Sequence, residues 1–128
     1  MNYYFSKEVN LSFDKAIARV TDELKKEGFG VLTEIDVKAT LKKKLDVDFR
    51  NYHILGACNP PFAHQALLAE PYIGLMLPCN VVVQDGENGK TIVSAIDSVA
   101  SMLAVENSSL GRVAEQVRAK LQKVINSL

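Results

Sequence analysis

Two apolar runs joined by a short glycine-bearing loop constrain the fold of this chain more than any other feature. Residues 77–84 and 90–96 carry clustered valine and isoleucine, and the loop between them, residues 85–89, reads Asp-Gly-Glu-Asn-Gly. A glycine-containing loop between two such runs is typical of a β-hairpin. Since a hairpin pairs antiparallel strands, an all-parallel sheet is excluded.

Apolar residues at helical spacing predict one amphipathic helix near each end of the chain. Ser12 is a suitable N-cap for the first helix, and Gly28 or Gly30 can end it in the left-handed conformation. Its periodic apolar positions are Phe13, Ile17, Val20 and Leu24. The second helix covers about 18 residues at the end of the chain, with Ser108 or Ser109 as its cap. Its periodic positions are Leu110, Val113, Val117, Leu121, Val124 and Leu128.

Tandem prolines predict a third helix in the middle of the chain. Asn59 is a good cap, and proline is favoured at the first helical position because its missing N–H would have no partner there. The helix should run from Pro60 to about Glu70, before Pro71.

The remaining segments complete a fold of the α+β class. Strands are predicted at residues 3–5, 31–37 and 52–58, a short helix at residues 39–45, and a short helix or turn at residues 97–105. The order is then β-α-β-(short α)-β-α-β-β-α, in which the hairpin separates the fold from all-parallel α/β proteins. No repeat, linker or low-complexity stretch divides the 128 residues, so we expect a single domain, residues 1–128.

Charge and hydropathy indicate the cellular compartment and exclude some classes of partner. The 15 Lys and Arg residues balance 15 Asp and Glu, and a nucleic-acid binder needs an uncompensated basic surface. The longest apolar stretch is too short to span a bilayer, and the N-terminus does not resemble a secretory signal. We therefore expect a cytoplasmic protein with no nucleic-acid and no membrane partner, whose two cysteines remain thiols.

The two cysteines mark the candidate site. Cys58 ends one predicted strand and Cys79 begins the next, so antiparallel pairing of these strands would bring both thiols together. Cys58 also precedes a helix start, where free N–H groups and the helix dipole favour negative charge and can lower a thiol pKa. Asn59 and Asn80, which follow the two cysteines, are candidate ligand-binding residues, and His64 lies one turn into the helix.

Three interpretations of this segment remain open. Cys58 can be an attacking thiolate that Cys79 resolves as a disulfide. Cys58, Cys79 and His64 can instead bind a soft metal such as zinc or copper, or the segment can bind a small ligand. Both cysteines can also be buried apolar residues of a structural or protein-interaction module. No standard cofactor motif is present, so the cofactor stays unassigned and catalysis is not established.

A pair of carboxylates forms a second candidate. Glu34 and Asp36 lie two residues apart on a predicted strand, hence on one face and about 7 Å apart. That spacing suits a divalent metal, paired acid/base work or a polar ligand, and it is also common on solvated strands. His53 is left out of the cysteine site because strand alternation points it away from Cys58.

Several predicted strands are apolar on both faces. Val81, Val82 and Val83 are consecutive, and Ile92 and Val93 are neighbours. Either helices cover both faces of the sheet or one bare face packs on a second copy. We expect the second arrangement, a homodimer, because two-fold homodimers are the commonest oligomers.

Three segments carry a family resemblance. Residues 33–41 read Thr-Glu-Ile-Asp-Val-Lys-Ala-Thr-Leu, residues 55–67 contain Leu-Gly-Ala-Cys-Asn-Pro-Pro and Ala-His-Gln-Ala-Leu, and residues 73–83 read Ile-Gly-Leu-Met-Leu-Pro-Cys-Asn-Val-Val-Val. Together they resemble the domain of unknown function 302 family over residues 5–128. The resemblance implies a small α+β domain with helices on one face of a mixed sheet of about five strands, similar to the TATA-binding-protein arrangement, and a dimer. It implies no activity, substrate or cofactor.

Overall fold

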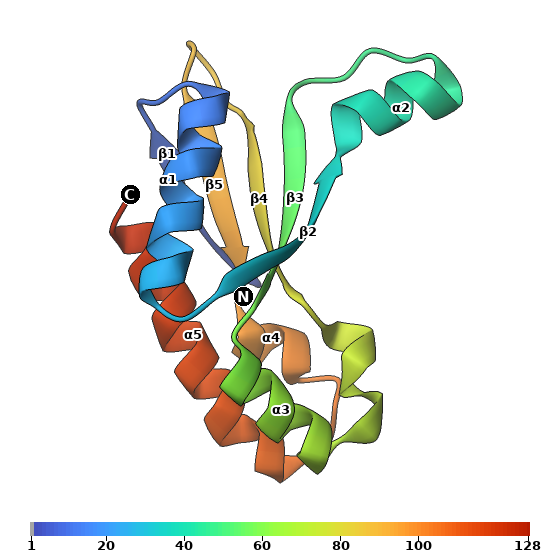
Figure 1. The fold of residues 1–128 in the computed structure, drawn as a ribbon, viewed down its shortest axis with the longest axis vertical. Helices are drawn as coiled ribbons and strands as arrows, with labels where there is room; N and C mark the ends of the chain where they lie inside the picture. Colours follow the sequence, from blue (N-terminus) through green and yellow to red (C-terminus); the bar gives the residue numbers. More distant parts are fainter. Residues whose placement is uncertain (1) are drawn as a thin grey trace.

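A single five-stranded sheet organises the molecule. The computed structural model describes residues 2–128. The strands are β1 (Tyr4–Val9), β2 (Gly30–Asp36), β3 (Tyr52–Cys58), β4 (Cys79–Asp85) and β5 (Thr91–Ile96). Their spatial order is β1-β5-β4-β3-β2, as Figure 1 shows. The hairpin predicted from the glycine-bearing loop is confirmed, since β4 and β5 pair antiparallel.

The helices follow the predicted order closely. They are α1 (Phe13–Lys26), α2 (Val37–Leu45), α3 (Pro60–Ala69), α4 (Ser98–Met102) and α5 (Gly111–Asn126), with 3₁₀ helices η1 (Pro71–Met76) and η2 (Ser108–Leu110). The α+β class is therefore confirmed. Within residues 2–128, no helix is both long enough and apolar enough to cross a membrane.

The sheet is antiparallel at every pairing, where a mixed sheet was expected. The unit β1-α1-β2 does place two parallel strands in the sheet. However, β1 and β2 form its opposite edges, with β5, β4 and β3 between them. The parallel strands never pair, because α1 crosses the whole sheet before the chain returns.

Local signals fix the ends of α1 as expected. Ser12 is the N-cap, and its side chain accepts a hydrogen bond from the Lys15 N–H at 3.4 Å. Gly28, with φ +86°, takes the left-handed conformation just after the helix. The expected serine cap of α5 is wrong: Ser108 and Ser109 lie in η2, which the Asn107 side chain caps. The helix itself begins at Gly111 without a side-chain cap.

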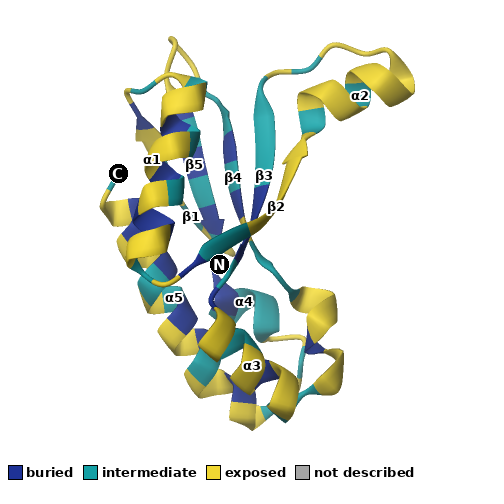
Figure 2. Cartoon of the chain, viewed as in Figure 1, coloured by how far each residue is buried: buried dark blue, intermediate teal, exposed yellow. Residues whose placement is uncertain are grey.

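The main core lies between one face of the sheet and two helices. Buried residues of α1 and α5 pack against alternate residues of the strands; the largest fully buried ones are Val20, Leu24, Leu55, Val81, Val83, Val93, Leu121 and Val124. A smaller cluster forms where α3, η1 and η2 meet, around Ala66, Ile73 and Leu110. Figure 2 shows the dark buried stripe on α1 facing the strands.

The α2 segment projects from the body of the molecule (Figure 1). Asp36 caps it by accepting a hydrogen bond from the Ala39 N–H at 2.9 Å, and none of its nine residues is buried. Figure 2 shows it almost entirely in the colour of exposed residues. Leu45 and Val47, at and after its end, are exposed apolar side chains.

Candidate functional site

A largely apolar cavity lies where the ends of β3 and β4 meet the lower helices of Figure 1. It has a volume of about 270 Å³ and is lined by residues from β2, the β3–α3 junction, the start of β4, and helices α3, α4 and α5. Leu32 and Leu67, both exposed, belong to this lining. The cavity is therefore open to solvent through apolar side chains.

Both cysteines line this cavity. The condition on which the sequence argument depended is met: β3 and β4 pair antiparallel, and Cys79 lies opposite Ala57, the residue before Cys58. Helix α3 and η1 form the connection between the two strands, which returns the chain to the same end of the sheet. The two thiols, 21 positions apart in the sequence, are thus brought to one cavity, and both are free.

The two cysteines differ in their surroundings. Burial and, to a smaller extent, the nearby Cys58 together raise the pKa of the Cys79 thiol to about 11. A thiol with this pKa is protonated at neutral pH, and the protonated form is neither a nucleophile nor a metal ligand. Cys79 therefore contributes an uncharged, polarisable surface to the cavity.

The helix start beside Cys58 differs from the expectation. Asn59 occupies the N-cap position but its side chain makes no capping hydrogen bond. Instead, its Nδ2 donates to the backbone carbonyl of Glu27, just after α1, at 3.0 Å. Asn59 is buried and lines the cavity, so it joins the end of α1 to the start of α3.

The other candidates near the cysteines lie elsewhere. Asn80 is exposed on the opposite, helix-free face of the sheet, because it alternates with the buried Val81. His64 is exposed on α3 and is not among the residues that line the cavity. Among residues 2–128, no three or more His, Cys, Asp or Glu side chains are placed to hold a metal ion.

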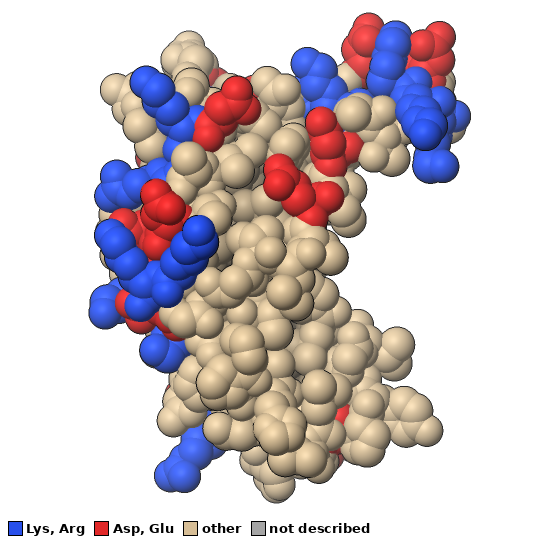
Figure 3. All heavy atoms as spheres, in the orientation of Figure 1, with Lys and Arg blue, Asp and Glu red and all other residues tan. Residues whose placement is uncertain are grey.

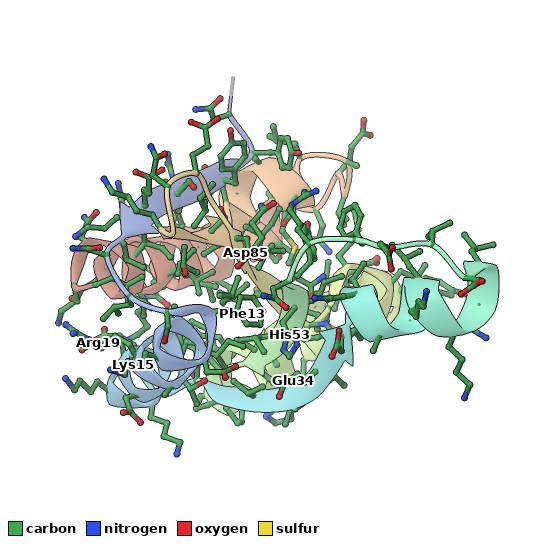
Figure 4. The ribbon with its side chains drawn as sticks, turned by 90° about the horizontal axis from the view of Figure 1, so that it is seen from above. Phe13, Lys15, Arg19, Glu34, His53 and Asp85 are labelled. Carbon is green, nitrogen blue, oxygen red and sulfur yellow. The ribbon has the colours of Figure 1, made fainter. Side chains whose placement is uncertain are left out.

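The predicted carboxylate pair meets a histidine that the sequence analysis set aside. His53 Nδ1 lies 2.7 Å from Glu34 Oε1, and Nε2 lies 3.5 Å from Asp36 Oδ2. Phe13 of α1 packs edge-on against the imidazole, with ring centroids 4.9 Å apart. Figure 4 shows His53 beside Glu34, with Phe13 near it. Each ring nitrogen thus faces a different carboxylate, so this cluster links β2, β3 and α1 by polar and aromatic contacts.

The register of the sheet explains why His53 belongs with the carboxylates. Asp36 pairs directly with His53, and Glu34 pairs with Leu55, two positions along β3. All of these side chains therefore lie on the helix-covered face. Strand alternation correctly separated His53 from Cys58, but only the pairing of β2 with β3 reveals its partner.

Several cavity residues carried no sequence signal for a ligand site. Ser98 and Met102 of α4 and Val117 of α5 also line the cavity. Ser98 Oγ donates to the Ala114 carbonyl at 2.7 Å, so its hydroxyl is already satisfied. The apolar spacing that includes Val117 indicates a helix, but not which cavity that helix closes.

Charged residues are distributed unevenly over the surface. In the view of Figure 3, they gather over α1 and α2, whereas the surface around α3 and η1 carries few of them. Helix α3, which helps to line the cavity, therefore lies in the less charged part of this view.

Comparison with known proteins identifies the family. The sequence profile described as "Domain of unknown function DUF302" matches residues 5–128. The crystal structure of an uncharacterized conserved DUF302 protein from Bacillus stearothermophilus is 28% identical, with a TM-score of 0.90 over 98% of each chain. No curated protein matches the chain. The resemblance of the three sequence segments is thus confirmed, and the chain belongs to the DUF302 family.

Proposed function

We propose that this protein binds a small organic ligand in the cavity beside Cys58 and Cys79. The cavity itself is the observation that carries the proposal. Ligand sites are typically concave, mostly apolar and few per protein, and this one gathers residues from both the sheet and the helices.

The volume limits the size of the ligand. An apolar cavity of about 150 Å³ can hold benzene, and drug-sized ligands occupy about 300–1,000 Å³. At about 270 Å³, the cavity lies between these limits. A one-ring or two-ring molecule, or a short aliphatic chain, fits this space.

The chemistry of the lining favours binding over the two alternatives from the sequence. A Cys58–Cys79 redox pair requires thiolates during exchange, and the raised pKa of Cys79 works against ionisation. A soft metal held by Cys58, Cys79 and His64 requires a third ligand, and His64 lies outside the cavity lining. A neutral thiol, in contrast, is a favourable surface for an apolar molecule.

A cavity-filling substitution tests the proposal. Indole, an uncharged two-ring probe, should bind saturably, and amide NMR shifts should report the binding at residues such as Ala66 and Met102. Ala63→Leu adds three carbons at the cavity wall and should weaken binding at least tenfold. Ala119→Leu is the matched control, because Ala119 is exposed on α5 outside the lining. It should bind as the parent does.

Two outcomes would contradict the proposal. One is the absence of saturable binding by the parent up to about 5 mM indole, which corresponds to an affinity too weak for a dedicated site. The other is unchanged binding by a folded Ala63→Leu variant. If that variant does not fold, Met102→Trp, which adds bulk at another lining residue, takes its place.

We also infer that a second copy of the chain covers the helix-free face of the sheet. An open hollow on this face is lined by side chains such as Tyr52, Val82 and Ile92, and none of its lining residues is charged among those described. The hollow itself would therefore place no charged side chain in the interface, and Arg50 borders it through its hydrogen bonds to Gln84. The nine-residue α2 is shorter than helices that are stable alone in water, so its projecting position also favours a partner.

A further inference from the structure

We infer that the ligand of this cavity is uncharged, because the start of α3 cannot act as an anion site. This inference rests on the proposed function and specifies the chemical class of the ligand. It reverses the expectation from the sequence, in which the helix start beside Cys58 attracts negative charge.

A helix N-terminus ordinarily binds anions through free N–H groups. The first residues of a helix carry N–H groups without an intrahelical acceptor, and the aligned peptide dipoles add partial positive charge. Helix α3 has ten residues, and Cys58 and Asn59 at its start line the cavity. On this basis alone a carboxylate or phosphate would be the natural ligand.

The two prolines remove most of the donors. Pro60 and Pro61 occupy the first two positions of α3 and have no N–H. The Ala63 N–H is already bonded to the Asn59 carbonyl at 2.9 Å. Of the first three helical residues, only Phe62 retains an N–H to offer. A single N–H is a weak counterpart for a buried anion, which normally needs several donors.

The side chains supply no substitute. One N–H of the Asn59 amide donates to the Glu27 carbonyl, so at most one of its two N–H groups is left for a ligand. The described residues that line the cavity include no Lys, Arg or His. The Cys79 thiol is uncharged at neutral pH because burial raises its pKa. The described lining holds no Asp or Glu either. A charged ligand of either sign would therefore lose its hydration for at most one or two N–H donors in return, whereas an uncharged apolar ligand loses little.

Two probes of equal size distinguish the effect of ligand charge on affinity from the effect of ligand size. Benzamide and benzoate share one ring and have the same number of heavy atoms as indole, and they differ from each other in charge. We expect benzamide to bind at least tenfold more tightly than benzoate to the parent protein at neutral pH. Titrations followed by amide NMR shifts measure both dissociation constants, with indole as the reference ligand of the cavity.

Restoring the missing donors tests the cause. The double variant Pro60→Ser, Pro61→Ala returns two N–H groups to the start of α3. It should tighten benzoate by about threefold to tenfold, the range expected for helix-terminal charge effects. Its affinity for indole should stay within about twofold of the parent. Pro71→Ala is the matched control: Pro71 begins η1 and does not line the cavity, so neither affinity should change.

The possible results separate this inference from the proposed function. If indole binds in the cavity but benzoate binds as tightly as benzamide, the inference is wrong and the proposed function stands. If benzoate discrimination persists unchanged in the double variant, the prolines are not its cause and the inference is likewise wrong. If none of the three probes binds saturably, the proposed function is wrong, and the inference about its ligand is lost with it.

Discussion

Gly56 of β3 lies against Thr33 of β2 so closely that no side chain fits between them. The two residues are paired across the strands, next to a register irregularity between Val31 and Thr33. A Cβ on Gly56 would stand 2.1 Å from Thr33 Oγ1 and 2.7 Å from Pro78 Cγ. Glycine at this position therefore lets β2, β3 and the segment before β4 approach one another.

Replacing Gly56 by alanine should destabilise the protein strongly. The added methyl group must displace Thr33 and Pro78, and overpacking of this kind costs about 1–3 kcal/mol. Gly30→Ala is the matched control on the neighbouring strand, because a Cβ there meets nothing within 4 Å, and we expect a change within about 0.5 kcal/mol. Urea unfolding of both variants and the parent measures the difference. Equal midpoints for Gly56→Ala and Gly30→Ala would show that the contact is readily relaxed.

Much of the fold could be predicted because its signals are local. The Ser12 cap, the proline start of α3 and the glycine-bearing hairpin each lie within a few residues of the element they define. The order of strands across the sheet is not local. The long crossing of α1 from one edge to the other, which makes the sheet antiparallel throughout, depends on which faces pack together. No short segment encodes it.

The candidate site, like the fold, could be predicted only where its signals are local. The end of one strand and the start of its antiparallel neighbour bring Cys58 and Cys79 to one cavity, and their positions in the sequence were enough to suggest this. Alternation with the buried Val81 places Asn80 on the helix-free face. Asn80 was predicted to belong to the site only because it follows Cys79 in the sequence. The contribution of Met102 could not be foreseen, because it depends on how α4 docks. The role of Asn59 also depends on a distant partner, the carbonyl of Glu27.

The raised pKa of Cys79 predicts a specific loss of stability in alkaline solution. The thiol ionises near its ordinary value of 9.0 in the unfolded chain and at about 11 in the folded protein. Between these values the folded state holds more protons than the unfolded state, so the free energy of unfolding falls as pH rises. The stabilising contribution is complete below pH 9 and is lost by about pH 11, with a magnitude of roughly 2–3 kcal/mol.

Urea unfolding from pH 8 to 11 checks this expectation against Cys79→Ala. The variant lacks the thiol, so its stability should fall less steeply over this range, while tyrosine and lysine ionisation affects both proteins alike. The difference in unfolding free energy between parent and variant should be constant near pH 8 and should shrink toward pH 11. Parallel curves throughout would mean that Cys79 titrates normally in the folded protein.

The helix-free face of the sheet gives the last prediction. Val82 lies on the central strand β4 and lines the hollow of this face. If a second copy covers it, the parent should sediment at twice 14.1 kDa at micromolar concentration. Val82→Lys would place two ammonium groups in a symmetric interface, because each substitution occurs twice, and should weaken the dimer at least about 100-fold.

Ala119→Lys, exposed on α5, is the control and should remain dimeric. Sedimentation velocity distinguishes the two masses, and circular dichroism verifies that both variants are folded. A parent that stays at the monomer mass up to about 100 μM would contradict the dimer, since two-fold interfaces of ordinary size associate more tightly than this.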